Sequence, residues 1–425
     1  MSAFDKVVGY EGVKNELLQI CDNIKNREIY DKLGAKLPSG MMLYGDPGLG
    51  KTLLAKCFIE ESGVKAFIIR KNQGNGRFIE EITETFQKAK DHAPSIILLD
   101  DMDKFANEDD NHRDAEEYVA VQAGIDSVKG CGVFVLATVN DKYKLPDSLR
   151  RSGRFDSILE LERPTEDDAR KIVQHYLSNK KLSDDVDMDD LIKMIRYSSC
   201  AELESILNNA AISAAYYRKD CVEMQDLIDS VLKKQYNAPK TANKTTDEER
   251  ERIALHEAGH VVVCEVLLEG SVGLASLRGQ DGEVGGFMQR CKKLPRRPQN
   301  VLLNLGGKAA VELYYADSVA SGTSSDLSEA VRYIRDGIMD TATSGIGCID
   351  IWPNYRPTYS NEYLRSTELV VHIELEKMLL KTREILLKNR EFLEKTRDML
   401  LEKETLLASD IKNIRKEINI TQVCI

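Results

Sequence analysis

The chain has 425 residues, of which 42% are hydrophobic, and this exceeds what one compact core usually holds. Two or three globular domains are therefore expected, and a disordered or fibrous protein is excluded. The 59 Lys and Arg residues against 70 Asp and Glu residues give a formal net charge of −11 that is spread along the chain, which argues against nucleic acid as a partner.

No stretch of the sequence approaches the roughly 18 to 20 consecutive apolar residues of a membrane span, and the first residues lack the apolar run of a signal peptide. Nine cysteines are scattered without a C-x-x-C pair, which is typical of reduced thiols. We therefore expect a soluble cytoplasmic protein, located at the cytoplasmic face of a membrane if the chain is a piece of an anchored protein.

Apolar strands and helix-compatible segments alternate in the first part of the chain. Strand-like runs occupy residues 41–44, 65–69, 95–99 and 133–137. This alternation predicts an α/β domain with a parallel sheet covered by helices. The strand signals stop after Pro164, where amphipathic helices begin. The predicted boundaries are an α/β domain at 1–163, a small helical domain at 164–236, a polar linker at 237–246 and a mainly α-helical domain at 247–425.

A glycine-rich turn follows the first strand and matches G-x-x-x-x-G-K-[ST]. Its residues are Gly45, Asp46, Pro47, Gly48, Leu49, Gly50, Lys51 and Thr52. Such a loop turns backbone N–H groups onto phosphate oxygens, Lys51 neutralises phosphate charge, and Thr52 offers a hydroxyl to Mg²⁺. The motif lies between a strand and a helix-compatible run, so the sequence predicts a site for ATP and Mg²⁺.

Carboxylates follow the strand-like run at 95–99. Asp100 is predicted to hold Mg²⁺, and Asp101 to polarise the water that attacks the γ-phosphate. An acidic cluster after a strand is, taken alone, more often a solvated helix cap. The preceding phosphate loop favours the metal–nucleotide interpretation.

The next strand ends at Asn140, and the segment Arg150-Arg151-Ser152-Gly153-Arg154-Phe155-Asp156 lies shortly after it. Here the sequence resembles the AAA+ ATPases. The resemblance implies that Asn140 senses the γ-phosphate and that Arg151 and Arg154 are arginine fingers reaching a neighbouring subunit, with Ser152 in place of the family's usual proline. Ordinary surface charge is the alternative for both arginines. As fingers they would make ATP hydrolysis depend on a ring of subunits.

The second half contains His256-Glu257-Ala258-Gly259-His260 within a helix-compatible run. Residues four apart share one helix face, so His256 and His260 can bind one Zn²⁺, while Glu257 can act as the general base that takes a proton from the attacking water. With only six histidines in the chain, chance placement of such a pair is a poor explanation.

A catalytic zinc site needs a third protein ligand, and the residues alone leave Glu283, Glu312, Asp326, His372 and Glu374 open. The segments at 252–260, 285–289, 305–310 and 321–327 are similar, in order, to the peptidase domain of the FtsH-type ATP-dependent metalloproteases. The resemblance covers nearly the whole chain, and it implies that Asp326 is the third zinc ligand. Without it, Asp326 would be interpreted as a helix cap.

The resemblance implies an ATP-dependent zinc endopeptidase that acts as a homohexamer and unfolds, translocates and degrades unfolded or tagged protein substrates. It assigns 1–163 to the large ATPase subdomain, 164–236 to its helical lid and 247–425 to the peptidase. The segment 285–289 is expected to pair with extended substrate as an edge strand. Two alternatives are a remodelling ATPase whose peptidase half is only a scaffold, and an adaptor that binds nucleotide but turns it over slowly.

Three departures from the family pattern affect these expectations. The N-terminal membrane helices of the family are absent from this sequence, and Asp101 stands where the family has Glu. The segment 71–80 is short for a pore loop, and Phe78 is the nearest equivalent of the substrate-gripping aromatic, unless it is a core residue of the next helix. The Leu/Glu/Lys-rich tail from about 360 to 418 is interpreted as helices that pack on their own domain rather than as a coiled coil.

Overall fold

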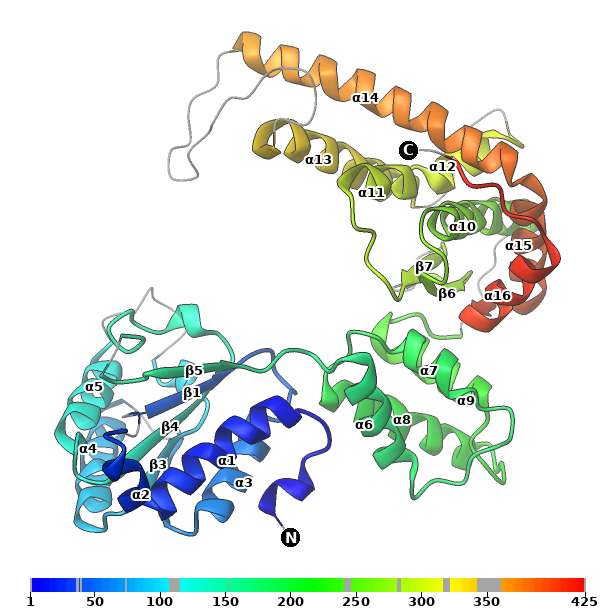
Figure 1. Cartoon of the computed structure of the whole chain (residues 1–425). Coiled ribbons are helices and arrows are strands. Elements are labelled where there is room, and N and C mark those ends of the chain that lie inside the picture. Colours follow the sequence, from blue (N-terminus) through cyan, green and yellow to red (C-terminus); the bar gives the residue numbers. More distant parts are fainter. Residues whose placement is uncertain are drawn as a thin grey trace. The chain divides into compact units, whose positions relative to one another are not determined.

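The structure is a computed structural model. It describes residues 2–35, 38, 40–72, 75–106, 115–151, 153–240, 246–280, 284–315, 322–341 and 361–423. The chain forms two compact units (Figure 1). One comprises Met1–Lys181 with Tyr197–Asn209, and the other comprises Leu182–Arg196 with Ala210–Ile425.

A five-stranded sheet forms the centre of the first unit, and every neighbouring pair of its strands is parallel. Across the sheet the order is β2 (Lys65–Ile69), β3 (Ser95–Leu99), β4 (Val133–Val139), β1 (Gly40–Tyr44) and β5 (Ser157–Glu160). The four predicted strands are confirmed, and β5 was not predicted. Because all strands run the same way, the segments that follow β1, β3 and β4 meet at one edge of the sheet.

Alternate residues of the buried strands pack on opposite faces of the sheet. On one face lie α1 (Glu11–Lys25), α3 (Lys51–Ser62) and the short helix η1 (Ala3–Lys6), and on the other lie α4 (Asn75–Asp91) and α5 (Glu116–Val128). Leu43, for example, packs with the α1–α3 layer, whereas Met42 packs with the α4–α5 layer. The expected α/β architecture is confirmed. The remaining short helices are α2 (Arg27–Lys32), η2 (Met102–Lys104) and η3 (Lys142–Lys144).

Helices follow the sheet domain, as expected from the loss of strand signals after Pro164. They are α6 (Glu166–Leu177), α7 (Met188–Met194), α8 (Cys200–Tyr216) and α9 (Met224–Gln235). The side chain of Thr165 caps α6 by accepting a hydrogen bond from the Asp168 N–H at 3.2 Å.

The remainder of the chain is mainly helical, as predicted. Its helices are α10 (Asp247–Leu267), α11 (Arg297–Asn304), α12 (Gly306–Glu312), α13 (Thr323–Thr341), α14 (Asn361–Lys388), α15 (Arg390–Lys403) and α16 (Ala408–Glu417). A small antiparallel sheet has the order β7 (Phe287–Arg290), β6 (Val272–Ser276) and β8 (Thr405–Leu407). Helix α10 starts with a capping box between Thr246 and Glu249 and is buried over most of its length.

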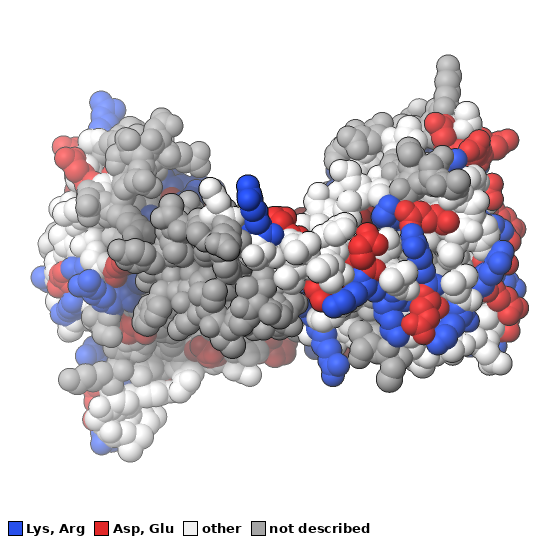
Figure 2. All heavy atoms as spheres, turned by 90° about the horizontal axis from the view of Figure 1, so that it is seen from above, with Lys and Arg blue, Asp and Glu red and all other residues white. Residues whose placement is uncertain are grey.

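The tail helices α14 and α15 pack on their own domain, as expected. Leu386 and Phe392 are fully buried in the same core cluster as Val262 of α10. Both signs of charge lie interspersed on the face drawn in Figure 2. Within the part of the chain described here, no helix has both the length and the apolar character needed to cross a membrane.

Candidate functional site

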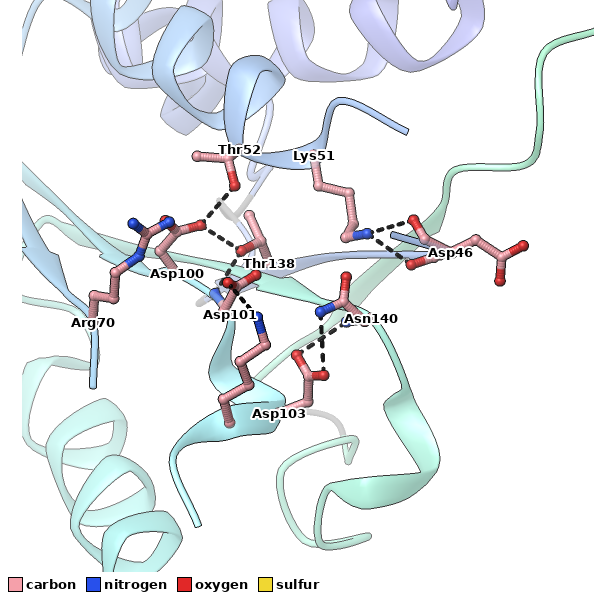
Figure 3. A network of polar contacts seen from close by, with 11 residues as sticks. Asp46, Lys51, Thr52, Arg70, Asp100, Asp101, Asp103, Thr138 and Asn140 are labelled. Atoms are coloured by element: carbon pink, nitrogen blue, oxygen red, sulfur yellow. Dashed lines mark hydrogen bonds and ion pairs between the residues drawn. The ribbon is translucent and has the colours of Figure 1, made fainter. Parts of the chain in front are cut away.

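The glycine-rich loop joins β1 to α3 in the first unit. Gly50 takes a left-handed conformation with φ 91°, which favours glycine, and α3 begins at the next residue. The Lys51 ammonium donates hydrogen bonds to the carbonyl oxygens of Gly45 at 2.7 Å and Asp46 at 2.8 Å (Figure 3). Burial lowers the pKa of Lys51, and nearby carboxylates oppose that shift. The loop thus places a partly desolvated cation at the carboxyl edge of the sheet.

Asp100 follows β3 at the same edge and is nearly fully buried. Its Oδ1 accepts hydrogen bonds from the hydroxyls of Thr52 at 2.9 Å and Thr138 at 2.8 Å. Its Oδ2 lies 2.5 Å from Nη2 of Arg70. The structure therefore brings together the two residues predicted to hold Mg²⁺, Thr52 and Asp100. A hydroxyl beside a carboxylate is a donor set that suits this ion.

Two further predicted residues lie beside this pair. Asp101 adopts a left-handed conformation with φ 55°, its N–H donates to the Thr138 hydroxyl at 2.9 Å, and its carboxylate pairs with Lys104 at 2.9 Å. Asn140, at the end of β4, donates its backbone and side-chain N–H groups to the two carboxylate oxygens of Asp103, at 3.0 and 3.3 Å. The side chain of Asn140 is thus oriented by Asp103 at the edge where the phosphate loop lies (Figure 3).

The two predicted arginine fingers differ in their surroundings. Arg151 is exposed. The Arg154 guanidinium bonds to the Asp126 carboxylate at 2.9 Å, to the Ser148 carbonyl at 2.8 Å and to the Gln122 side chain at 3.1 Å. Arg154 is thus held by contacts within its own chain. Ser152 lies outside the described residues.

The prediction that Phe78 is a pore-loop aromatic is wrong. Phe78 lies in α4, is 0% exposed and packs edge-on against Phe105 with ring centroids 4.9 Å apart. Because it belongs to the core between α4, α5 and the sheet, its ring is not available to a substrate.

In the second unit, His256, His260 and Asp326 bring three ligand atoms together. Nε2 of each histidine lies 3.0 Å from Asp326 Oδ2, and the two Nε2 atoms lie 3.1 Å apart. Tetrahedral Zn²⁺ with ligand bonds of about 2.0 to 2.1 Å separates neighbouring ligand atoms by roughly 3.3 Å. The three side chains therefore fit a zinc ion with little adjustment.

The surroundings orient these ligands. His260 Nδ1 lies 2.8 Å from the Leu303 carbonyl, which fixes the ring so that Nε2 faces the other ligands. Burial lowers the pKa of His256. Burial opposes protonation of His260 as well, but the hydrogen bond and charge of Asp326 outweigh it and raise the pKa of His260 to about 9. Burial alone would raise the pKa of Asp326, yet its bonds to both histidines hold it well below its usual range.

Glu257 is buried beside the three ligands, next to the edge strand. Burial raises the pKa of Glu257 to about 8. A Cβ added to Gly286 would lie 2.7 Å from Cγ of Glu257, so only glycine fits where the chain enters β7. The predicted edge strand is present as β7, which pairs only with β6 among the described strands.

The other candidates for the third ligand are placed elsewhere or occupied. Glu312 forms ion pairs with Lys308 and Arg383, and Glu374 pairs with Lys377. His372 is exposed, and Glu283 lies outside the described residues. Asp326 is in the first turn of α13, and its carboxylate faces both imidazoles.

The sequence interpretation missed several residues that shape the two sites. Thr138 and Arg70 contact Asp100, and Gly307 lies against the His256 ring. Thr138 and Arg70 lie near the carboxyl ends of β4 and β2. Aligning the predicted parallel strands by their carboxyl ends would therefore have placed both residues at the same edge of the sheet as Asp100. No motif of the sequence pointed to Gly307.

Together the fold and the two sites define an ATPase domain with a phosphate-binding loop, joined in one chain to a domain with the ligand set of a zinc peptidase. Residues 41–163 match the ATPase family associated with various cellular activities (AAA), and residues 243–414 match Peptidase family M41. The chain belongs to the FtsH-type AAA+ zinc metalloproteases.

The similarity to curated relatives extends over nearly the whole chain. The ATP-dependent zinc metalloprotease FtsH of Leptotrichia buccalis is 31% identical over 97% of this chain and 56% of its own length. The proteins of the same name from Ureaplasma parvum and Mycoplasma pneumoniae are 30% and 29% identical over 97% and 98% of this chain. The chain spans 56% to 62% of the length of these three relatives.

Proposed function

We propose that this chain is an ATP-dependent zinc endopeptidase that unfolds, translocates and degrades protein substrates. The observation that carries the proposal is the convergence of His256, His260 and Asp326 on one point, in the same chain as a phosphate loop with Thr52 bonded to Asp100. The names of the relatives support both halves of this activity.

In the peptidase half, His256, His260 and Asp326 would hold Zn²⁺, which when bound would supply Lewis-acid chemistry to the carbonyl of the scissile peptide. Glu257 takes a proton from the attacking water, whose oxygen forms a bond to the carbonyl carbon. The same carboxyl then gives that proton to the leaving nitrogen as the C–N bond breaks. Glu257 is buried and follows His256 directly in α10, so it lies close to these ligands.

Substrate is proposed to bind along β7. Among the described strands β7 is at the edge of its sheet, so its outer side can pair with an extended peptide, which supplies affinity with little sequence selectivity. Gly286 brings the start of this strand against Glu257, so a peptide paired with β7 passes the general base.

In the ATPase half, residues 45–52 would bind the phosphates of ATP and Thr52 and Asp100 would hold Mg²⁺. Asp101 would orient the attacking water, and Asn140 would contact the γ-phosphate. Arg151 and Arg154 serve a neighbouring subunit of a homohexamer. The proposed domains are a large ATPase subdomain at 1–163, its helical lid at 164–236 and the peptidase at 247–425. A linker at 237–246 joins the lid to the peptidase, and its residues 241–245 lie outside the described residues.

A cytoplasmic location is part of this proposal. Seven cysteines are free thiols in the described part of the chain, as expected in a reducing compartment. Fractionation of cells that make the protein at its natural level, with detection in the cytosolic and membrane fractions, tests this point.

Casein degradation by the purified chain tests the function. We expect degradation that requires ATP and Mg²⁺, stops with a zinc chelator and is lost in Glu257→Gln, while this variant keeps one zinc per chain and its ATPase activity. Wild-type ATPase activity without degradation of any unfolded substrate would contradict the peptidase proposal and leave a remodelling ATPase.

A further inference from the structure

The carboxylate assigned to Mg²⁺ already has a cation beside it. Arg70 Nη2 lies 2.5 Å from Asp100 Oδ2, while the hydroxyls of Thr52 and Thr138 bond to Oδ1 (Figure 3). Asp100 is only 4% exposed, so the guanidinium covers one of the two oxygens of a nearly buried carboxylate. A buried carboxylate needs such a partner, because an unpaired charge there is costly.

The sheet fixes the position of Arg70. Ile69 of β2 is opposite Leu99 of β3 in a parallel pair, so Arg70 and Asp100 leave the sheet side by side. The Asp100 N–H donates to the Ile69 carbonyl at 3.0 Å, and the Lys71 ammonium donates to the Phe105 carbonyl at 2.6 Å. The backbone before Arg70 and the side chain after it are therefore both held by hydrogen bonds.

The side chain of Arg70 is 57% exposed and reaches Asp100 from solvent. Thr52 bonds to the other carboxylate oxygen, so the Thr52–Asp100 contact can persist when Arg70 leaves. Replacing the guanidinium at Asp100 thus requires a rotation of one side chain and no rearrangement of the sheet.

We propose that Arg70 is a positioning residue that neutralises Asp100 in the metal-free site and is displaced when Mg²⁺ and nucleotide bind. Two cations at one carboxylate repel each other, so each weakens the binding of the other. Arg70 thereby sets the Mg²⁺ concentration at which the ATPase site becomes loaded. This inference rests on the proposed ATPase function.

The test is a Mg²⁺ titration of the full chain with a fluorescent, non-hydrolysable ATP analogue, read by fluorescence anisotropy. Arg70→Gln removes the charge and keeps a polar side chain of similar reach. Because the carboxylate is buried but the guanidinium is 57% exposed, we expect the half-saturating Mg²⁺ concentration to fall roughly 3- to 10-fold. Arg70→Lys, which keeps the charge, should stay close to the wild type.

Lys104→Gln is the matched control, because Lys104 is an exposed cation paired with the neighbouring carboxylate of Asp101. It should change the half-saturating Mg²⁺ concentration by less than about twofold, since it removes the same charge without uncovering Asp100. An equal shift in both variants would show a general field effect and overturn the proposal.

Thermal unfolding gives a second readout that does not depend on bound nucleotide. In EDTA, Arg70→Gln should unfold at a lower temperature than the wild type, because Asp100 loses its counter-ion, and Mg²⁺ with the analogue should close this gap. If the wild type binds the analogue with Mg²⁺ but Arg70→Gln needs the same Mg²⁺ concentration or a higher one, the inference is overturned. A wild type that fails to bind the analogue overturns the proposed ATPase itself.

Discussion

Gly307 shows how little room surrounds the candidate zinc ligands. A Cβ added at this position would lie 2.3 Å from Cε1 of His256, a separation that real Cβ atoms do not show. The ring cannot move away without breaking its 3.0 Å contact with Asp326. We expect Gly307→Ala to lower zinc content and casein degradation at least about tenfold, in the range seen when groups that orient metal ligands are lost.

Elemental analysis of the purified variant checks this prediction. Gly12→Ala is the control, because Gly12 also lies in a helix and nothing lies within 4 Å of a Cβ there. Full zinc occupancy in Gly307→Ala would show that α12 can shift and that the close approach is unimportant.

For Asp101 the question is whether the side chain is long enough to orient the attacking water. Asp is one methylene shorter than the Glu of the family, so unless the backbone at Asp101 advances toward the γ-phosphate, its oxygen would fall about 1 to 1.5 Å short of the expected position, a misplacement that can cost on the order of 10²-fold in rate. Its carboxylate also pairs with Lys104 at 2.9 Å. We therefore expect Asp101→Glu to raise the steady-state ATPase rate at saturating ATP. A slower Glu variant would show that the left-handed backbone at Asp101 already compensates for the shorter side chain.

The sequence alone predicted those site residues that lie close to one another along the chain. Helix geometry alone places His256 and His260 on one face and Glu257 beside them. Asp326 is 70 residues from His256, so its role needed the family resemblance. Arg70 and Gly307 act through the sheet register and through the packing of α12 on α10, which no local pattern of the sequence contains.

At the scale of elements, α4 is a case in which the family motif and the apolar pattern of the helix predict different positions for one residue, Phe78. The family pattern favours a pore-loop aromatic near Phe78, but α4 begins at Asn75, and the helix buries Phe78 together with Ile82 and Phe86. The spacing of four residues between successive members of this set is that of a buried helix face. The four-residue apolar spacing therefore predicted the position of Phe78 better than the family motif did.

This correction can be tested in α4. Phe78→Ala should lower the free energy of unfolding by about 3 to 5 kcal/mol, because it leaves a cavity between α4 and Phe105. Phe78→Leu keeps most of the buried volume and should cost less than about 1.5 kcal/mol while keeping casein degradation. Urea unfolding and casein assays on both variants check this. Normal stability of Phe78→Leu with loss of degradation would restore the substrate-gripping role.

The strand β5 shows the limit of the strand signals. The other four strands are continuous apolar runs or nearly so, whereas Ser157–Glu160, at the edge of the sheet, has only two apolar residues between two polar ones. An edge strand needs only one apolar face, so a four-residue segment carries too little pattern to stand out from a loop.

At the scale of the whole molecule, the proposed ring makes ATP hydrolysis depend on two arginines that differ in their surroundings. Arg154 is bound to Asp126 and to the Ser148 carbonyl, so it must leave these partners to reach another subunit. Arg151 is exposed and can make such a contact without this cost. A single substitution at Arg154 therefore removes bonds within its own chain and also the proposed contact with a neighbouring subunit.

Comparing the two variants separates these effects. Arg151→Ala should leave the urea midpoint unchanged, whereas Arg154→Ala should lower it, because it removes bonds that Arg154 makes within the subunit. Both should bind ATP yet hydrolyse it slowly, since an arginine finger contributes about 10³- to 10⁵-fold to the rate. In the wild type, ATPase activity per chain should fall steeply on dilution, and sedimentation at the same concentrations should show dissociation. Undiminished turnover in the dissociated wild type would rule out a finger role for either arginine, because no neighbouring subunit would then be present to receive it.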